Sequence, residues 1–162
     1  MRAKILDIHD IQVTSCRELI CDTVRGVWFQ LGGSLTENFY TRAMAVSLQE
    51  SSCTCHVEDP IPVPFFDNKD DRKHYIGTCR ADINMLMPNR TRVLIEIKHI
   101  QANDSILKQA KQQVIKYNYL LGVNEREQAQ ILVVIIFPKY NDDSPFVVLY
   151  SKHGNELEKI QL

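Results

Sequence analysis

Three charged side chains lie in otherwise apolar stretches, and their types suit them to phosphate chemistry. Asp82 belongs to the segment ADINML, and Glu96 and Lys98 belong to the run VLIEIKH. Ionised groups are costly in apolar surroundings unless they are paired or bound to a metal. Two carboxylates can hold one hard cation such as Mg²⁺, which prefers oxygen ligands and keeps several waters. Such an ion polarises a phosphate, and a lysine beside it can orient water or stabilise developing charge.

Two predicted strands position these three side chains. Residues 79–87 form the first strand, a Pro-Asn-Arg turn follows, and residues 92–99 form the second. Alternate side chains of a strand share one face, so Glu96 and Lys98 point to the same side. Because the second strand is so apolar, we expect it to be central and covered on both faces. The tips of all three charged side chains are then expected to meet.

Composition bounds the class of protein. The chain has 162 residues, of which 44% are hydrophobic and 24% charged, as in a soluble globular protein. We expect a single domain over residues 1–162, with its core at about 16–150. A net charge of −1 excludes a global basic signature, so any contact with nucleic acid must come from a local patch.

The chain also lacks the sequence marks of membrane insertion and export. No apolar run approaches the ~20 residues that span a bilayer, and the start MRAKILDIHD has no signal-peptide core. The five cysteines, an odd number, are typical of reduced thiols. We therefore expect an intracellular protein, cytoplasmic or nuclear, with no membrane contact.

Three helices are predicted. The first runs from about Ser15, capped by Thr14 or Ser15, to the Gly32-Gly33 pair. The second follows the cap Ser34 through about Leu48, and Glu37 stands at capping-box spacing from Ser34. The third spans about 104–121, with Asn103 or Asp104 as its cap and Gly122 after its end.

The remaining segments are predicted as strands and loops. Residues 53–57 begin a strand, and Pro60, Pro62 and Pro64 confine the following segment to a sheet edge. The charged stretch 68–74 is predicted as a solvated turn, with a phosphate-contacting loop through Lys69, Arg72 and Lys73 as the alternative. Residues 130–137 form a buried strand, 146–150 form a last strand at the sheet edge, and 152–162 form a short helix or a partly disordered tail.

The order of these pieces resembles the PD-(D/E)xK nuclease superfamily, whose D-(x)n-E-x-K motif is matched by Asp82, Glu96 and Lys98. The resemblance implies an α/β fold with a three-layer restriction-endonuclease-like core, in which helices flank a mixed central β-sheet. It implies that Asp82, Glu96 and the backbone carbonyl of Ile97 bind Mg²⁺ or Mn²⁺, and that Lys98 positions or activates water. Ala81 stands where the superfamily loosely keeps a proline.

The segment LGGSLTENFY is similar to the signature of the GxxExxY family, a branch of the same superfamily. Glu37 and Tyr40 match that signature, whereas its glycine falls on Ser34. The resemblance implies that Glu37 assists catalysis and that Tyr40 contacts substrate. From the local sequence alone, Glu37 can equally well do no more than close a capping box.

The third helix carries a further resemblance. The pair Gln113 and Tyr117 is similar to a Gln…Tyr motif that several branches of the superfamily carry on the helix after E-x-K. In those branches the glutamine approaches the metal site and the tyrosine approaches the substrate backbone. Gln109 and Gln112 are alternative alignments for the glutamine.

Together these patterns predict a Mg²⁺-dependent nuclease of the repair, recombination or processing type that hydrolyses phosphodiester bonds in DNA. The alternative is a catalytically silent nucleic-acid- or protein-binding module on the same fold. A third hypothesis is a zinc-stapled adaptor that uses Cys53, Cys55 and His56. The sequence leaves open whether the protein forms a homodimer.

Overall fold

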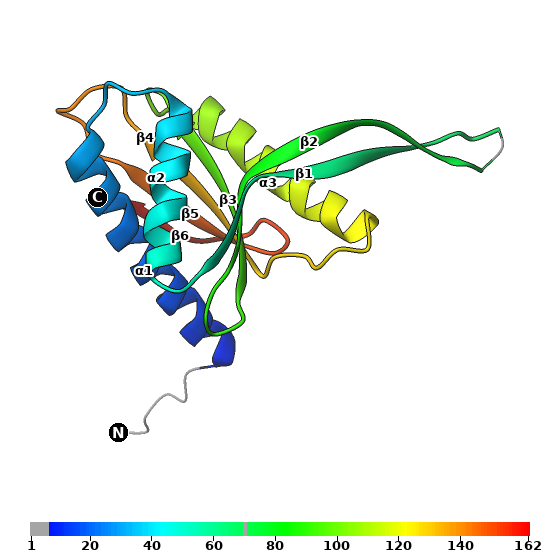
Figure 1. Ribbon diagram of the computed structural model, residues 1–162, viewed down its shortest axis with the longest axis horizontal. Helices are drawn as coiled ribbons and strands as arrows, with labels where there is room; N and C mark the ends of the chain where they lie inside the picture. The colour runs from blue at the N-terminus through cyan, green and yellow to red at the C-terminus, as the bar shows by residue number, and fades with distance from the viewer. Residues whose placement is uncertain (1–6, 70) are drawn as a thin grey trace.

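The computed structural model describes residues 7–69 and 71–162 and arranges them in three layers around one β-sheet (Figure 1). The elements are α1 (Ile8–Leu31), α2 (Glu37–Glu50), β1 (Thr54–Phe66), β2 (Lys73–Leu86), β3 (Arg92–His99), α3 (Asp104–Val123), β4 (Ile131–Phe137), β5 (Phe146–Ser151) and β6 (Glu156–Gln161). The strands lie in sequence order in the sheet; β3 and β4 are parallel, and the other neighbouring pairs are antiparallel. Helices α1 and α2 cover one face, and α3 covers the other. The predicted mixed sheet flanked by helices is confirmed.

The two central strands are buried on both faces. Val93, Ile95 and Ile97 of β3 pack against α1 and α2, whereas Leu94 packs towards α3. Every residue of β4 is buried. Continuous apolar runs of this kind are typical of parallel strands covered by helices. The predicted alternation is confirmed, and it leaves Glu96 on the α3 face of the sheet.

Helix α1 begins earlier than the sequence predicts. It starts at Ile8, with Asp7 at the N-cap position, so neither Thr14 nor Ser15 caps it. Ile8 and Ile11 are 73% and 50% exposed, and the first turns therefore lack the buried stripe from which the helix was predicted. Residues 1–6 lie outside the described residues.

Helix α3 is capped as predicted but ends later. The side chain of Asn103 accepts a hydrogen bond from the backbone N–H of Ile106 at 2.9 Å. Gly122 lies inside the last turn, and Asn124 occupies the C-cap, so Gly122 is not the residue that follows the helix. The later end lengthens the helix that covers this face of the sheet.

The C-terminal segment is a strand, so the prediction of a helical or disordered tail is wrong. Strand β6 pairs with β5, which is therefore not the sheet edge. Ile160 and Leu162 pack against the core under α1 and α2, and Glu158 forms an ion pair with Arg17 of α1 at 3.0 Å. These contacts with a distant helix give the polar segment its alternation of inward and outward residues.

Strand β1 forms the predicted edge of the sheet. Proline has no N–H for a ladder and is tolerated where that group would point away from the neighbouring strand. The carbonyls of Pro60 and Pro62 accept hydrogen bonds from the side chains of Arg126 and Asn124, at 3.0 and 2.9 Å. Loop side chains thus cover this edge in place of another strand.

The β1–β2 hairpin is longer than predicted. Strand β2 begins at Lys73 rather than near Cys79, so Lys73 and His74 of the stretch predicted as a turn over 68–74 belong to β2, whereas Asn68 and Lys69 lie in a turn. The hairpin extends beyond the body of the molecule, to the right in Figure 1. In the described part of the chain, no helix combines the length and the apolar character needed to cross a bilayer.

Candidate active site

The candidate site lies where β2 and β3 separate. Their ladder ends at the pair Ile83 and Ile95. Beyond that pair, the Oδ2 atom of Asp82 accepts a hydrogen bond from the backbone N–H of Ile97 at 2.6 Å. The carboxylate thus takes the place of a backbone carbonyl, and this bond fixes Asp82 beside the segment of β3 that carries Glu96.

Glu96 is a buried carboxylate with one unsatisfied oxygen. Its side chain is 5% exposed, and its Oε1 atom lies 2.8 Å from Nζ of Lys98. The Oε2 atom is buried, and no donor among the described residues reaches it. A buried acceptor without a partner is costly, so this oxygen marks a place for a further positive or hydrogen-bonding group.

Both carboxyl groups hold their protons more tightly than usual. Burial and the charge of Asp82 raise the pKa of Glu96 to about 7, against the opposing effect of Lys98. Burial raises the pKa of Asp82 to about 6, although the N–H of Ile97 acts in the opposite direction. Two poorly solvated, mutually repelling carboxylates require positive charge when both are ionised.

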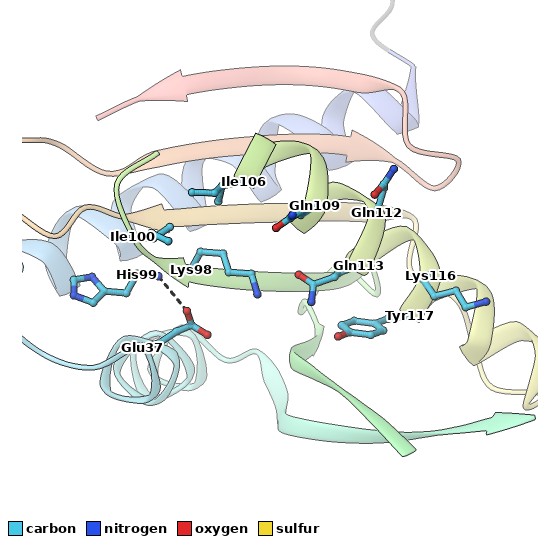
Figure 2. A pocket seen from close by; sticks show the side chains of 10 residues that line it. All are labelled: Glu37, Lys98, His99, Ile100, Ile106, Gln109, Gln112, Gln113, Lys116 and Tyr117. Atoms are coloured by element: carbon cyan, nitrogen blue, oxygen red, sulfur yellow. Dashed lines mark hydrogen bonds between the residues drawn. The ribbon is translucent and has the colours of Figure 1, made fainter. Parts of the chain in front are cut away.

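Lys98 supplies part of that charge and points into a pocket. Burial lowers the pKa of Lys98, but the hydrogen bond to Glu96 and the nearby acidic groups outweigh burial and raise it. Lys98 is therefore an ammonium ion at neutral pH, a donor of hydrogen bonds rather than a base. In Figure 2 it extends from β3 towards Gln113 and Tyr117 of α3.

Glu37 reaches the same site from the first turn of α2. Its Oε2 atom accepts a hydrogen bond from the backbone N–H of His99 at 3.2 Å (Figure 2). Thr36 occupies the N-cap of α2 and makes no side-chain capping bond, so the interpretation of Glu37 as a capping-box residue is wrong. The charge of Glu37 contributes to the raised pKa values of Asp82, Glu96 and Lys98.

A pocket of about 600 Å³ opens beside Glu37 and Lys98, whereas Asp82 and Glu96 are not part of its lining. Its lining comes from α2, the end of β3 and one side of α3: Glu37, Lys98, His99, Ile100, Ile106, Gln109, Gln112, Gln113, Lys116 and Tyr117. All three candidate glutamines line it, but only Gln113 lies between Lys98 and Tyr117 (Figure 2). Burial and the charge of Glu96 raise the pKa of Tyr117, so its phenol is a protonated donor.

Tyr40 lies outside this pocket. It is fully buried, stacks on Phe137 with ring centroids 4.6 Å apart, and donates its hydroxyl hydrogen bond to the carbonyl of Gly32. A side chain with no exposed surface and an occupied hydroxyl does not meet substrate. The expectation that Tyr40 contacts substrate is therefore corrected to a packing role beneath the pocket.

His99 lines the pocket directly beside Lys98. Its ring lies 4.7 Å from that of Tyr40, and its Nδ1 atom lies 3.2 Å from the carbonyl oxygen of Phe137. Its position directly after Lys98 is the one sequence signal that pointed to it. The partners of the ring come from α2 and β4, which are distant in sequence.

The buried carboxylate of Glu96 and the half-buried carboxylate of Asp82 suit a hard divalent cation. Mg²⁺ needs only one or two protein carboxylates because it keeps several waters, and a cation would satisfy the unpartnered oxygen of Glu96. Within the described ranges, no group of three or more His, Cys, Asp or Glu side chains is arranged to hold a metal. Asp82 and Glu96 would therefore need backbone oxygens or water to complete a coordination shell.

The cysteine-histidine cluster is not such a site. Cys53 and Cys55 lie in or against the core under α1 and α2. His56 instead lines a small pocket with Arg92 and Arg126. Successive strand residues point to opposite faces, so the three side chains do not converge. The zinc-stapled adaptor therefore has no support in the described structure.

Comparisons with known proteins place the chain in a family. The chain matches the model of the PD-(D/E)XK nuclease superfamily over residues 14–136, and this match leaves the GxxExxY branch untested. The six-stranded mixed sheet flanked by helices is consistent with a restriction-endonuclease-like fold. A solved structure titled "Crystal structure of SSO0001" is similar at 14% identity and a TM-score of 0.42, covering 91% of this chain and 81% of that chain. No curated protein matches the chain.

Proposed function

Because the chain belongs to the PD-(D/E)XK nuclease superfamily, we propose that it is a Mg²⁺- or Mn²⁺-dependent nuclease that hydrolyses phosphodiester bonds in DNA. One observation carries the metal dependence. Glu96 Oε2 is buried without a donor among the described residues, and Asp82 is close enough to raise the pKa of Glu96. Two such carboxylates require positive charge nearby when both are ionised, which a bound cation would supply. We further assign the chain to the GxxExxY branch, on the basis of Glu37.

Asp82, Glu96 and the backbone carbonyl of Ile97 are the groups proposed to hold the cation. When bound, the cation would polarise the scissile phosphate and make a coordinated water more acidic. The hydrogen bond from Ile97 N–H to Asp82 supports this role because it fixes the carboxylate without help from solvent.

Lys98, Gln113 and Tyr117 are proposed to act on the water and the substrate. The Lys98 ammonium can donate to an attacking water or to a phosphate oxygen, where it stabilises the charge that develops. The neutral Tyr117 phenol and the Gln113 amide offer further donors to the phosphate backbone from α3. Glu37 is a positioning residue, because its hydrogen bond holds the backbone of His99, directly after Lys98.

The test is cleavage of supercoiled, linear and single-stranded DNA with Mg²⁺ or Mn²⁺, beside the same reactions in EDTA. Metal-dependent cutting by the wild type and its loss in Lys98→Ala are expected. The matched control is Lys152→Ala, which removes an exposed lysine from the turn between β5 and β6. Absence of metal-dependent cutting on all three substrates, or equal cutting by Lys98→Ala, would refute the proposal.

A further inference from the structure

The outer part of the β1–β2 hairpin carries large apolar side chains that are more than half exposed. We call residues 64–69 and 71–76 the arm, and it projects from the body of the molecule (Figure 1). Its exposed fractions are 54% for Phe65, 56% for Phe66, 59% for Tyr75 and 66% for Ile76. An isolated two-stranded hairpin is marginally stable in water, so a partner that covers these side chains would stabilise the arm.

The aromatic side chains lie on both faces of the arm. Phe65 is opposite His74, and Phe66 is opposite Lys73. Because neighbouring residues of a strand point to opposite faces, Phe65 and Phe66 cannot belong to one flat patch. A stable protein interface needs about 800 Å² of contiguous surface on each partner. Bases of a single strand can instead stack on isolated aromatic rings on either side of a ribbon.

The balanced charge of the arm favours binding of a nucleic-acid strand by stacking of its bases over binding by neutralisation of its phosphates. Between Phe65 and Tyr75 the sequence FFDNKDDRKHY holds three acidic and three basic residues besides one histidine. The Lys73 Nζ atom lies 5.2 Å from the ring centroid of Tyr75. A charge-balanced arm releases few counterions when it binds, so it adds little to the salt dependence of binding.

The arm is continuous with the candidate active site. Tyr75 and Asp82 lie on the same strand, β2. At about 3.3 Å per residue, roughly 23 Å separate them, which is the length of about seven stacked nucleotides. Lys73 also reaches the carbonyl oxygen of Val123 at 3.4 Å, and this bond ties the arm to the helix that lines the pocket.

We propose that the arm is a base-stacking platform that binds single-stranded DNA beside the cleavage site through Phe65, Phe66 and Tyr75. This inference rests on the proposed nuclease function. It adds a substrate form, a DNA strand with unpaired bases, and a minimum length, about seven nucleotides to one side of the pocket.

The test compares a triple variant, Phe65→Ser with Phe66→Ser and Tyr75→Ser, with the wild type in the full chain. The matched control is Phe29→Ser with Tyr140→Ser, which removes exposed aromatics away from the arm. Fluorescence anisotropy in EDTA measures the binding of a single-stranded 30-mer, a 6-mer and a 30-base-pair duplex over a range of salt. Turnover of bis(p-nitrophenyl) phosphate with Mn²⁺ measures the catalytic activity of the site alone, because this small diester is too short to reach the arm.

The triple variant is expected to bind the single-stranded 30-mer at least about tenfold more weakly, with an unchanged salt slope. Binding of the 6-mer and the duplex is expected to change less than about threefold, and turnover of the small diester is expected to stay at the wild-type level. The control variant is expected to match the wild type throughout. Circular dichroism checks that the fold is retained.

An unchanged affinity for the 30-mer would overturn the inference, as would an equal loss on the duplex. A change in sedimentation coefficient with normal DNA binding would also overturn it and would show the arm to be a protein contact. If the wild type fails to cleave any diester but the 30-mer result holds, the proposed function fails and the arm inference survives. If cleavage holds and the 30-mer result fails, the arm inference alone is refuted.

Discussion

Replacing Glu96 by glutamine tests whether the candidate site is electrostatically strained without metal. Glutamine keeps the shape of the side chain and an oxygen that can face Lys98, but it carries no charge. We expect Glu96→Gln to abolish metal-dependent cleavage and, in EDTA, to stabilise the fold at pH 8. At pH 5 its free energy of unfolding is expected to match that of the wild type.

The magnitude follows from the pKa of Glu96. Burial and Asp82 raise that pKa from the ordinary 4.5 to about 7. A raised carboxyl pKa means that the folded protein binds the proton more tightly than the unfolded chain does. The resulting stabilisation is complete below pH 4.5 and is lost as the pH rises through about 7. One pKa unit corresponds to about 1.36 kcal/mol. The free energy of unfolding of the wild type should therefore fall by about 2–3 kcal/mol between pH 5 and pH 8, and that of the variant should not show this fall.

The assay is urea unfolding in EDTA at pH 5, 6, 7 and 8, followed by circular dichroism. Other groups titrate over the same range, so the informative quantity is the difference between the variant and the wild type at each pH. Glu127→Gln is the matched control, since Glu127 is a 61% exposed acid paired with Arg92. Its difference from the wild type should not change with pH by more than about 0.5 kcal/mol. The reasoning is refuted if Glu96→Gln is no more stable than the wild type at pH 8.

Three further predictions concern the proposed metal ligands and two buried side chains, Tyr40 and Cys16. Adding 10 mM Mg²⁺ at pH 8 should raise the midpoint of thermal unfolding of the wild type but not of Asp82→Asn, because a ligand that binds only the folded state stabilises it. Scanning calorimetry measures both midpoints, and equal shifts in the two proteins would contradict the proposed ligands. Tyr40→Phe should lower the free energy of unfolding in urea by about 1 kcal/mol, because the partly buried carbonyl of Gly32 loses its hydrogen-bond donor. Cleavage should stay within about twofold of the wild type, and a large loss of cleavage would restore a substrate role to Tyr40. Burial raises the pKa of the Cys16 thiol to about 12, so little reactive thiolate is present at neutral pH. Mass spectrometry after iodoacetamide treatment of the native protein should therefore find Cys16 unmodified. Rapid labelling of Cys16 would show that α1 opens readily.

The sequence predicted those features that depend on local periodicity. The alternation of Val93, Leu94 and Ile95 identified a strand buried on both faces, and the spacing of Gln113 and Tyr117 put both on one side of a helix. Asp82 and Glu96 converge because the short turn after β2 leaves their strands adjacent. In each of these cases the deciding interaction lies within one element or between neighbours.

Features set by distant contacts escaped prediction. The partner of Glu37 is the backbone of His99, far along the chain, so the local spacing favoured a capping box equally well. The sequence of β6 alone resembles that of a polar tail. In the structure, Ile160 packs on the core and Glu158 forms an ion pair with Arg17. Tyr40 matched a signature of substrate contact, yet its environment is a core formed by α2 and β4. Burial of that kind depends on the complete fold and not on neighbouring residues.

The proline-rich edge of β1 decides how this sheet can associate with other chains. An incoming strand needs alternating donors and acceptors from the edge that it joins. Proline withholds the donors at Pro60 and Pro62, and Arg126 and Asn124 already occupy the acceptors. Along this segment the sheet is closed to strand addition, whether by a peptide or by an aggregating copy. The opposite border of the sheet, along β6, has no proline and so keeps its backbone donors for one more strand.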